Sequence, residues 1–325
     1  WGNMHWGHFE STDLIHWEEK PIALYQNTTS DMMFSGGGFV DSGNSAELGK
    51  DTLFVAFTST GRGECLAYSK DGGITFTELK KNPVIEHEGR DPKVIWYEPG
   101  QKWVMAVYNS QPCAETKAIP AREGTPPNRT HNNIAFWESK DLRNWKRTGA
   151  FTHADRDSVH ECPELFELPV EGKPNESRWI LYGAQNRYFI GEFDGKTFHA
   201  ESGPHGDPRE PQKVGPAGGR GTMYAAQTFS NIPDGRRIQM GWVRTAPDLE
   251  SYPDQVVSQS MSLPHELILR ETARGLRLFY QPVTELENLR ARLLTEDVDG
   301  LAAAEGKLAE IMIEFKKAGT HTVSY

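Results

Sequence analysis

The sequence has no basic cluster and no run of like charges, and its formal net charge is −10 over 325 residues. We therefore expect neither nucleic acid nor an anionic membrane surface as a partner. It also lacks an apolar segment of membrane-spanning length, so we expect no membrane insertion. Its three cysteines, Cys65, Cys113 and Cys162, are odd in number and widely spaced. They show no metal-ligand spacing and cannot form a disulfide framework.

What the chain has in quantity is aromatic and turn-forming residues: 9 Trp, 10 Tyr, 15 Phe, 31 Gly and 20 Pro. This composition favours many short strands joined by tight turns. Short runs rich in β-branched and aromatic residues predict strands at 53–57, 94–97, 103–108, 179–182 and 238–243. Residues 111–130 and 199–221 are rich in Pro or Gly and are predicted to be long loops, where ligand contacts tend to lie.

A short turn sequence recurs along the chain. The run STDLIHW at 11–17 resembles SKDGGITF at 69–76 and SKDLRNW at 139–145, and DGKTF at 194–198 is a shorter copy. A polar turn that ends in an aromatic residue and returns at similar intervals predicts a β-propeller with one such turn in each blade. The alternative is that short Ser-Asp-aromatic turns recur by chance in a β-protein.

Glu161 opens the run ECPELFELP at 161–169, which otherwise resembles a buried strand. A carboxyl group held against apolar walls has its charged form disfavoured, so we expect a raised pKa that suits a general acid. The alternative is an ordinary acidic residue exposed at a strand end.

Other stretches supply groups that could accompany Glu161. Phe34 and Ser35 offer an aromatic wall and a hydroxyl, and Arg90 and Asp91 place a guanidinium beside a carboxylate. Residues 1–8 bring together several Trp and His rings. Because sugars present both apolar C–H faces and vicinal hydroxyls, this mixture is typical of a sugar site. The histidines are expected to pack among the Trp rings, and no metal is predicted.

Seven motifs, in order along the chain, resemble those of glycoside hydrolase family 32, the levanase, exo-inulinase and invertase group that acts on β-fructofuranosides. The resemblance covers about the first 290 residues. The motifs are WGNMHWGHFESTDLIHW at 1–17, FSGGGFVD at 34–41, RDPKV at 90–94, ECPELFELPV at 161–170, YFIGEFDGKTF at 188–198, YAAQTFSNIPDGRRIQMGW at 224–242 and LPHEL at 263–267.

The resemblance implies an all-β fold, a five-bladed β-propeller with an axial funnel, followed by a β-sandwich. It implies retaining hydrolysis with no cofactor, in which Glu161 is the general acid/base and Asp91 stabilises the transition state. The residues implied to bind substrate are Trp1, Phe34, Ser35, Arg90, Cys162 and Trp242, with Trp242 in the least well matched surroundings. The implied domains are a propeller at 1–283, a linker at 284–295 and the start of a β-sandwich, cut short, at 296–325.

The sequence also departs from the family pattern. The family nucleophile is an Asp in an Asn-Asp-Pro-Asn-Gly run, and that run is not in these 325 residues. We therefore expect an incomplete first blade, possible self-association through its exposed edges, and fructosidase activity near zero for this polypeptide. His160 stands where many members have Trp, and such departures leave sucrose, inulin and levan unseparated as substrates.

Two other functions stay open. One is a non-catalytic propeller that binds fructan or another carbohydrate. The other is a five-bladed glycosidase that acts on arabinose-containing polymers by inversion, which needs carboxyl groups about 6.5–9.5 Å apart instead of about 5–5.5 Å. Because fructan polymers lie outside the cell, the expected location is secreted or periplasmic.

Overall fold

The computed structural model describes residues 4–86, 89–118, 132–155, 158–206, 223–243 and 260–291. The chain divides into two compact units, Trp1–Val283 and Thr284–Tyr325. The described residues of the second unit hold a 3-10 helix, η4 (Thr284–Leu289). The rest of the predicted linker, from residue 292, and the predicted β-sandwich at 296–325 lie outside the described residues.

The first unit is built almost entirely of strands that pair in sequence order. Within each group consecutive strands pair antiparallel, except that in the last group Ile238–Val243 pairs with both Ser260–Met261 and His265–Thr272. One parallel contact, between Val170 and Leu269, joins the last two groups into a single sheet. The strands are β1 (Trp6–Glu10) and β2 (Glu18–Leu24); β3 (Met33–Asp41), β4 (Thr52–Ser59), β5 (Gly63–Ser69) and β6 (Thr77–Glu78); β7 (Gly89–Tyr97), β8 (Lys102–Asn109), β9 (Asn133–Ser139) and β10 (Lys146–Phe151); β11 (Glu164–Val170), β12 (Lys173–Tyr182), β13 (Tyr188–Phe193) and β14 (Phe198–His205); β15 (Met223–Thr228), β16 (Ile238–Val243), β17 (Ser260–Met261), β18 (His265–Thr272) and β19 (Gly275–Pro282).

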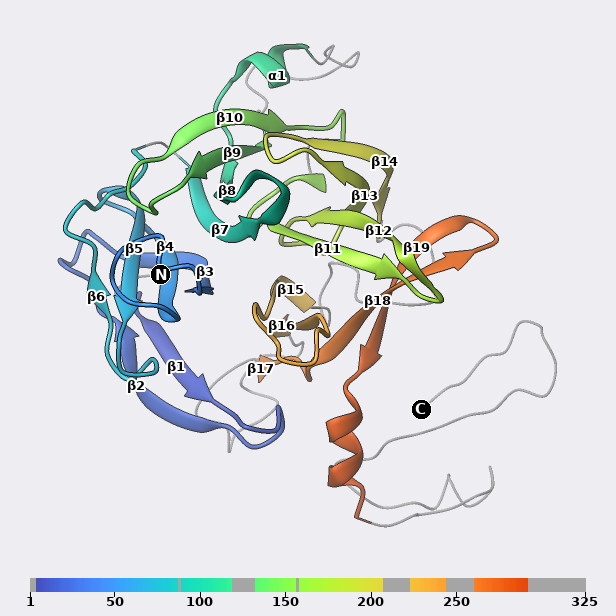
Figure 1. Cartoon of the computed structure of the whole chain (residues 1–325), viewed down its shortest axis with the longest axis horizontal. Helices are drawn as coiled ribbons and strands as arrows, with labels where there is room; N and C mark the ends of the chain where they lie inside the picture. The colour runs from blue at the N-terminus through green and yellow to red at the C-terminus, as the bar shows by residue number, and fades with distance from the viewer. Residues whose placement is uncertain are drawn as a thin grey trace, which may run out of the picture. The chain divides into compact units, whose positions relative to one another are not determined.

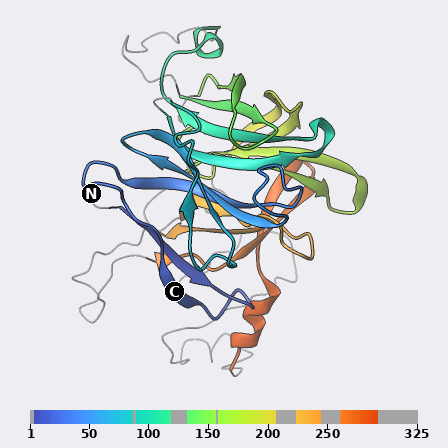
Figure 2. The same cartoon turned by 60° about the vertical axis from the view of Figure 1, so that its left-hand side comes forward.

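These groups are the blades of a five-bladed β-propeller. Figure 1 shows them around a common centre, with β3, β7, β11 and β15 as the innermost strands. The first blade is represented by the two-stranded sheet of β1 and β2, dark blue in Figures 1 and 2. The predicted all-β fold and propeller are thus confirmed, and each predicted strand lies within an observed one.

In each copy of the recurring turn the aspartate carboxylate accepts hydrogen bonds from backbone N–H groups that follow it, and three copies share one pattern. The carboxylates of Asp13, Asp141 and Asp194 each accept hydrogen bonds from the backbone N–H groups two and three residues ahead, at 2.7–2.9 Å. Asp71, followed by two glycines, accepts the N–H four residues ahead at 3.0 Å. Three copies join the third strand of a blade to its fourth. By the same placement, β1 and β2 are the outer pair of the first blade.

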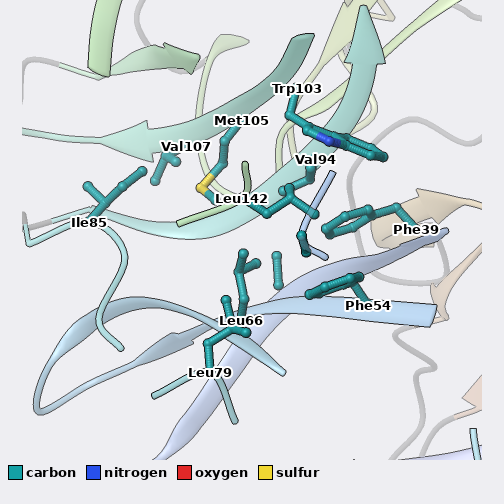
Figure 3. Packing of buried hydrophobic residues seen from close by; sticks show 12 residues of the cluster. Phe39, Phe54, Leu66, Leu79, Ile85, Val94, Trp103, Met105, Val107 and Leu142 are labelled. Carbon is teal, nitrogen blue, oxygen red and sulfur yellow. The ribbon is translucent and has the colours of Figure 1, made fainter. Parts of the chain in front are cut away.

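Separate hydrophobic clusters fill the spaces between successive blades. Figure 3 shows the cluster between β3–β5 and β7–β8, where the rings of Phe39 and Phe54 stack with their centroids 5.4 Å apart. Phe39 also contacts Trp103 at 5.0 Å. Similar clusters lie between the first and second, third and fourth, and fourth and fifth blades. Between the fifth blade and the first, Trp17 stacks on Phe229 with centroids 6.4 Å apart.

Two predicted loops were partly wrong. Within 111–130, residues Ala114–Ala118 form the short helix α1, and Thr116 anchors it by accepting the Cys113 N–H at 2.9 Å. Within 199–221, the chain continues as β14 to His205, because this edge strand pairs with β13 despite its Gly and Pro. Residues 119–131 and 207–222 lie outside the described residues.

Candidate active site

Three of the four innermost strands share a distortion near their first residues. In β3, β7 and β15 the pairing with the next strand shifts so that two residues face one, which is the signature of a β-bulge with one extra residue. The bulges lie between Met33 and Gly36, between Arg90 and Lys93, and between Tyr224 and Gln227. Each bulge turns side chains out of the strand alternation and toward the axis.

Left-handed backbone conformations accompany these bulges. Four residues other than glycine adopt positive φ here: Asp91 (64°), Glu161 (51°), Cys162 (42°) and Ala225 (51°). Such conformations cost about 1–3 kcal/mol each and persist where the surrounding structure over-determines them. The same conformation also occurs at turns away from the axis, such as Asn44 and Asp51, so it is informative here only together with the cavity beside these residues.

A cavity of about 260 Å³ opens at this point. Its size lies near the small end of ligand sites, which suits a single sugar ring. The lining combines aromatic, sulfur-containing and polar groups from all five blades. The lining residues are Met4, His5, Trp6, Met33, Ser35, Gly36, Asp91, Cys162, Ala225 and Gln227.

Arg90 joins the two predicted catalytic carboxylates. Its Nη2 donates to Glu161 Oε1 at 2.6 Å, and its Nε lies 3.6 Å from Asp91 Oδ2. Its guanidinium carbon stands 4.8 Å from the centre of the Tyr108 ring, which restricts its orientation. Asp91 and Glu161, 70 positions apart in the sequence, thus share one cation at the cavity.

Asp91 is buried and firmly held. Its Oδ2 accepts the Cys162 backbone N–H at 3.0 Å, and the Cys162 Sγ lies 3.6 Å from the same oxygen. Burial raises the pKa of Asp91 despite these bonds and Arg90. Burial, followed by the neighbouring Asp91 charge, raises the pKa of Cys162 well above its ordinary value, so Cys162 stays a thiol. Behind Asp91, its own N–H donates to Thr58, whose hydroxyl donates to buried Glu64 at 2.7 Å.

The prediction of a raised pKa for Glu161 was wrong. Burial does raise its pKa, but hydrogen bonds from Tyr224 and Arg90 outweigh this effect, and its pKa lies below the ordinary value. Glu161 precedes β11 and is not walled by apolar side chains alone, because donors reach both of its oxygens. With these donors in place Glu161 is an ionised carboxylate.

A buried ion pair lies beneath the site. Lys93 Nζ lies 2.6 Å from Glu164 Oε1, and the two side chains are 2% and 0% exposed. Thr228 completes the group, since it donates its N–H and hydroxyl to Glu164 and its carbonyl oxygen accepts from Lys93. Lys93, Glu164 and Thr228 come from β7, β11 and β15, so the group joins three inner strands directly below their distorted ends.

The structure brings most of the predicted site residues together. Ser35, Asp91 and Cys162 line the cavity, and Arg90 and Glu161 are bonded beside it. The carbonyl oxygen of Phe34 accepts the Trp6 indole N–H at 2.9 Å. Trp242 does not line the cavity but packs edge-on against Tyr224 at 6.0 Å. Trp1 lies outside the described residues.

Sequence reasoning missed Tyr224, Ala225, Gln227 and Trp6. Tyr224 bonds a carboxylate 63 positions away, and no local pattern signals such a contact. Ala225 faces the cavity only because of the bulge in β15. The alternation of inward and outward side chains along a regular strand does not reveal such an extra residue. The one available signal was position, since Tyr224, Ala225 and Gln227 all fall within the motif at 224–242.

The described residues contain neither a metal-ion site nor a membrane-spanning helix. Among the described residues, no group of three or more His, Cys, Asp or Glu side chains is arranged to hold a metal ion. In the same part of the chain, no helix has the length and apolar character needed to cross a membrane.

Comparisons with known proteins give a consistent result. The family model described as "Glycosyl hydrolases family 32 N-terminal domain" matches residues 1–282. The chain is 34% identical to a levanase of Bacillus subtilis, covering 97% of this chain and 47% of that protein. It is 32% identical to Invertase 2 of Saccharomyces cerevisiae, covering 90% of this chain and 53% of that protein.

A solved structure shows the same likeness. The β-fructofuranosidase from Schwanniomyces occidentalis complexed with fructosyl-erythritol matches with a TM-score of 0.66 and 28% identity, covering 87% of this chain and 55% of that one. The chain spans about half the length of the curated relatives that it matches.

Proposed function

The chain belongs to glycoside hydrolase family 32, and on this premise we propose that it forms the fructose pocket of a retaining β-fructofuranosidase. Its substrates would be the terminal β-D-fructofuranosyl residues of fructans or sucrose. The observation that carries the proposal is Arg90, which joins Glu161 and Asp91 beside a cavity of about 260 Å³. An acid/base and a charge stabiliser are thereby held together next to space for one sugar ring.

Glu161 acts in this proposal as general acid and then as general base. It must carry a proton when the glycosidic bond breaks, whereas the hydrogen bonds from Arg90 and Tyr224 keep it ionised. A sugar hydroxyl that draws Arg90 away from Glu161 Oε1 removes one of the hydrogen bonds that lower the pKa of Glu161. Substrate binding would then favour the protonated form of Glu161, which is the form that acts as the general acid.

Asp91 holds sugar hydroxyls and strengthens those contacts as the fructosyl ring gains positive charge. Its side chain is only 6% exposed, and the Cys162 N–H fixes one oxygen. A carboxylate held in this way need not reorganise during the reaction. Arg90 balances its charge and that of Glu161, while Ser35 and Phe34 complete the wall of the pocket.

The proposal includes impaired hydrolysis by a polypeptide of these 325 residues. The sequence contains no Asn-Asp-Pro-Asn-Gly run, and Asp91 is the one carboxylate among the described residues that line the cavity. Without a nucleophile the covalent fructosyl intermediate does not form. A second candidate function is a propeller that binds fructosyl ends without cleaving them, which the same cavity beside Arg90 and Asp91 would support.

Calorimetric titration of this polypeptide with fructose, short inulin chains and arabinose tests the pocket. We expect binding of fructose and of inulin chains in preference to arabinose. Asp91→Asn should weaken fructose binding about tenfold or more, because hydrogen bonds to a charged group contribute about 1.5–3 kcal/mol. Asp51→Asn, at an exposed turn position, is the matched control. Absence of fructose binding, or equal binding by Asp91→Asn, would refute the pocket.

A parallel assay of sugar release from sucrose, inulin and levan tests the impairment. We expect rates near zero for the 325-residue polypeptide, and a clear rate on any of the three would overturn this part of the proposal. Because the polymers cannot enter a cell intact, we also propose a secreted or periplasmic location.

We further propose self-association through the β1–β2 hairpin. Phe9 and Tyr25 on this hairpin are 56% and 63% exposed, and among the described strands β1 pairs with β2 alone. Exposed apolar side chains beside an open strand edge favour pairing between chains. Sedimentation velocity should show a mass that rises with concentration and a smaller rise for Phe9→Ser. A monomer at all concentrations would contradict it.

A further inference from the structure

His160 contacts the carboxylate on which the proposed chemistry depends. Its Nδ1 lies 3.4 Å from Glu161 Oε2, within the range of an ion pair when the imidazole is protonated. The Nδ1 atom is itself buried and makes no hydrogen bond with the described residues. A buried ring nitrogen without such a bond is costly unless it has an electrostatic role, and the neighbouring charge is the Glu161 carboxylate.

His160 is held through both its backbone and its ring. The His160 backbone carbonyl oxygen accepts the Ala184 N–H at 2.9 Å, and a Cβ at Gly183 would stand only 2.7 Å from that oxygen. The ring packs edge-on against Tyr108 with centroids 5.1 Å apart, and Tyr108 is anchored through Asn132 at 3.0 Å. Tyr108 is also the ring below Arg90, so it orients both cationic groups that face Glu161.

Solvent can reach the imidazole while the contact with Glu161 stays partly shielded. The His160 side chain is 32% exposed and that of Glu161 is 24% exposed. The contact therefore lies in a partly desolvated site, where the charge on one group strongly influences the other.

We propose that His160 is a positioning residue that holds the Glu161 carboxylate through Oε2 and so sets how strongly Glu161 binds its proton. This inference rests on the proposed role of Glu161 as acid/base. A protonated imidazole stabilises the carboxylate at Oε2, and a neutral imidazole releases that hold and favours the carboxylic acid. The step at which Glu161 gains or loses its proton would thus depend on the charge of His160.

Other charged and titratable groups also face this pair, and the effect of His160 acts in addition to theirs. Arg90 holds Oε1 at 2.6 Å, and Tyr224 donates to Oε2. The electrostatic influences on Glu161 include His160, after burial and after the bonds from Tyr224 and Arg90. The remaining groups around the pair are Asp91 from β7, Tyr108 from β8 and Cys162 from the same segment.

Carbon-13 NMR of the 325-residue chain with labelled Glu carboxyl groups tests the effect of His160 without any sugar. Glu161→Gln identifies the Glu161 signal by its loss. We expect the wild-type signal to give the pH at which Glu161 binds its proton. His160→Phe keeps a ring against Tyr108 but removes the imidazole. It should raise the proton affinity of Glu161 about tenfold.

His153→Phe is the matched control, because His153 makes a comparable ring contact, with Phe189 at 5.1 Å. It should leave the Glu161 signal unchanged. If His160→Phe does not fold, the imidazole signal of His160 in the wild type supplies the test. That signal should move in the pH interval where Glu161 titrates, and Glu161→Gln should abolish this movement.

Identical Glu161 titrations in the wild type and His160→Phe would overturn the inference, as would an imidazole signal that ignores Glu161. Neither result depends on ligand. Fructose titration is a separate measurement on the same wild-type sample. A pocket that fails to bind fructose while His160→Phe shifts the Glu161 titration would refute the proposed function alone.

Discussion

Replacing Lys93 with Met should be among the most damaging single substitutions in the propeller. Lys93 and Glu164 are 2% and 0% exposed and lie 2.6 Å apart. In Lys93→Met the Glu164 carboxylate stays buried and keeps its two bonds from Thr228, but it loses its cation. Removing one partner of a buried pair typically costs about 3–5 kcal/mol.

The structure places the expected loss toward the lower end, about 3 kcal/mol. Arg237 lies close enough to interact electrostatically with Glu164. Its Nη1 is 3.4 Å from the Thr228 hydroxyl, and its guanidinium stands 5.0 Å from the Phe166 ring. Part of the uncompensated charge would therefore be balanced by Arg237. A domain of ordinary stability, about 5–15 kcal/mol, would still lose a large fraction.

Adding Glu164→Gln to Lys93→Met should restore part of the loss. The double variant removes both charges of the pair and leaves Arg237 as the charged group beside it, and the Gln carbonyl oxygen can still accept one bond from Thr228. We expect a net loss of about 1–2 kcal/mol, the cost of the remaining unmet polar groups. The double variant should thus be more stable than the single one, although it carries more changes.

Urea unfolding followed by tryptophan fluorescence measures these free energies. Lys173→Met is the control, because Lys173 pairs with Glu271 at 2.8 Å with both side chains exposed. It should leave the unfolding midpoint unchanged, since exposed pairs contribute little. A loss below about 1 kcal/mol for Lys93→Met would refute the reasoning, given the usual cost of breaking a buried pair. So would a double variant less stable than Lys93→Met.

Three further substitutions test other parts of the site. Gly36→Ala should abolish folding or the cavity, because its Cβ would lie 1.8 Å from a carbonyl oxygen of β4. The control Gly43→Ala should be tolerated, because the nearest atom to its Cβ lies 3.7 Å away. Circular dichroism and thermal melting distinguish the two variants. Burial raises the pKa of Glu64 to about 8 from 4.5, so the folded state keeps a proton that the unfolded chain releases. Stability should therefore fall by about 1.4 kcal/mol per pH unit as pH rises between these values, and Glu64→Gln should remove that slope in urea titrations across the interval. Tyr224→Phe removes a donor to Glu161 and should raise the pKa of Glu161, measured by carbon-13 NMR; an unchanged or lower pKa would contradict the assigned hydrogen bond.

The sequence predicted the repeating architecture well because its signals are local. The aspartates of the recurring turn bond backbone groups two to four residues ahead, so each turn is specified within a few residues. The strands were predictable for the same reason, because their β-branched and aromatic composition is a local signal. The edge strand β14 was missed because its Gly and Pro disfavour a strand locally, and its pairing with β13 decides the outcome.

The sequence indicated which residues belong to the candidate site but not how they are arranged. The Arg90–Glu161 bond and the position of Tyr224 depend on how three blades close around the axis, which no local pattern encodes. The pKa of Glu161 was predicted in the wrong direction for this reason. Its neighbours in the sequence are apolar, but the groups that reach its oxygens come from β7 and β15.

The bulges of the inner strands have a consequence for how such a pocket can change over evolutionary time. Each extra residue, as at Asp91 or Ala225, presents its side chain to the axis without taking part in the regular pairing of its strand. A substitution there alters what the pocket recognises, while the alternation that buries the blade is preserved. Recognition and folding are thereby assigned to different residues of the same strand. A propeller of this kind can acquire new sugar specificities with little loss of folding stability.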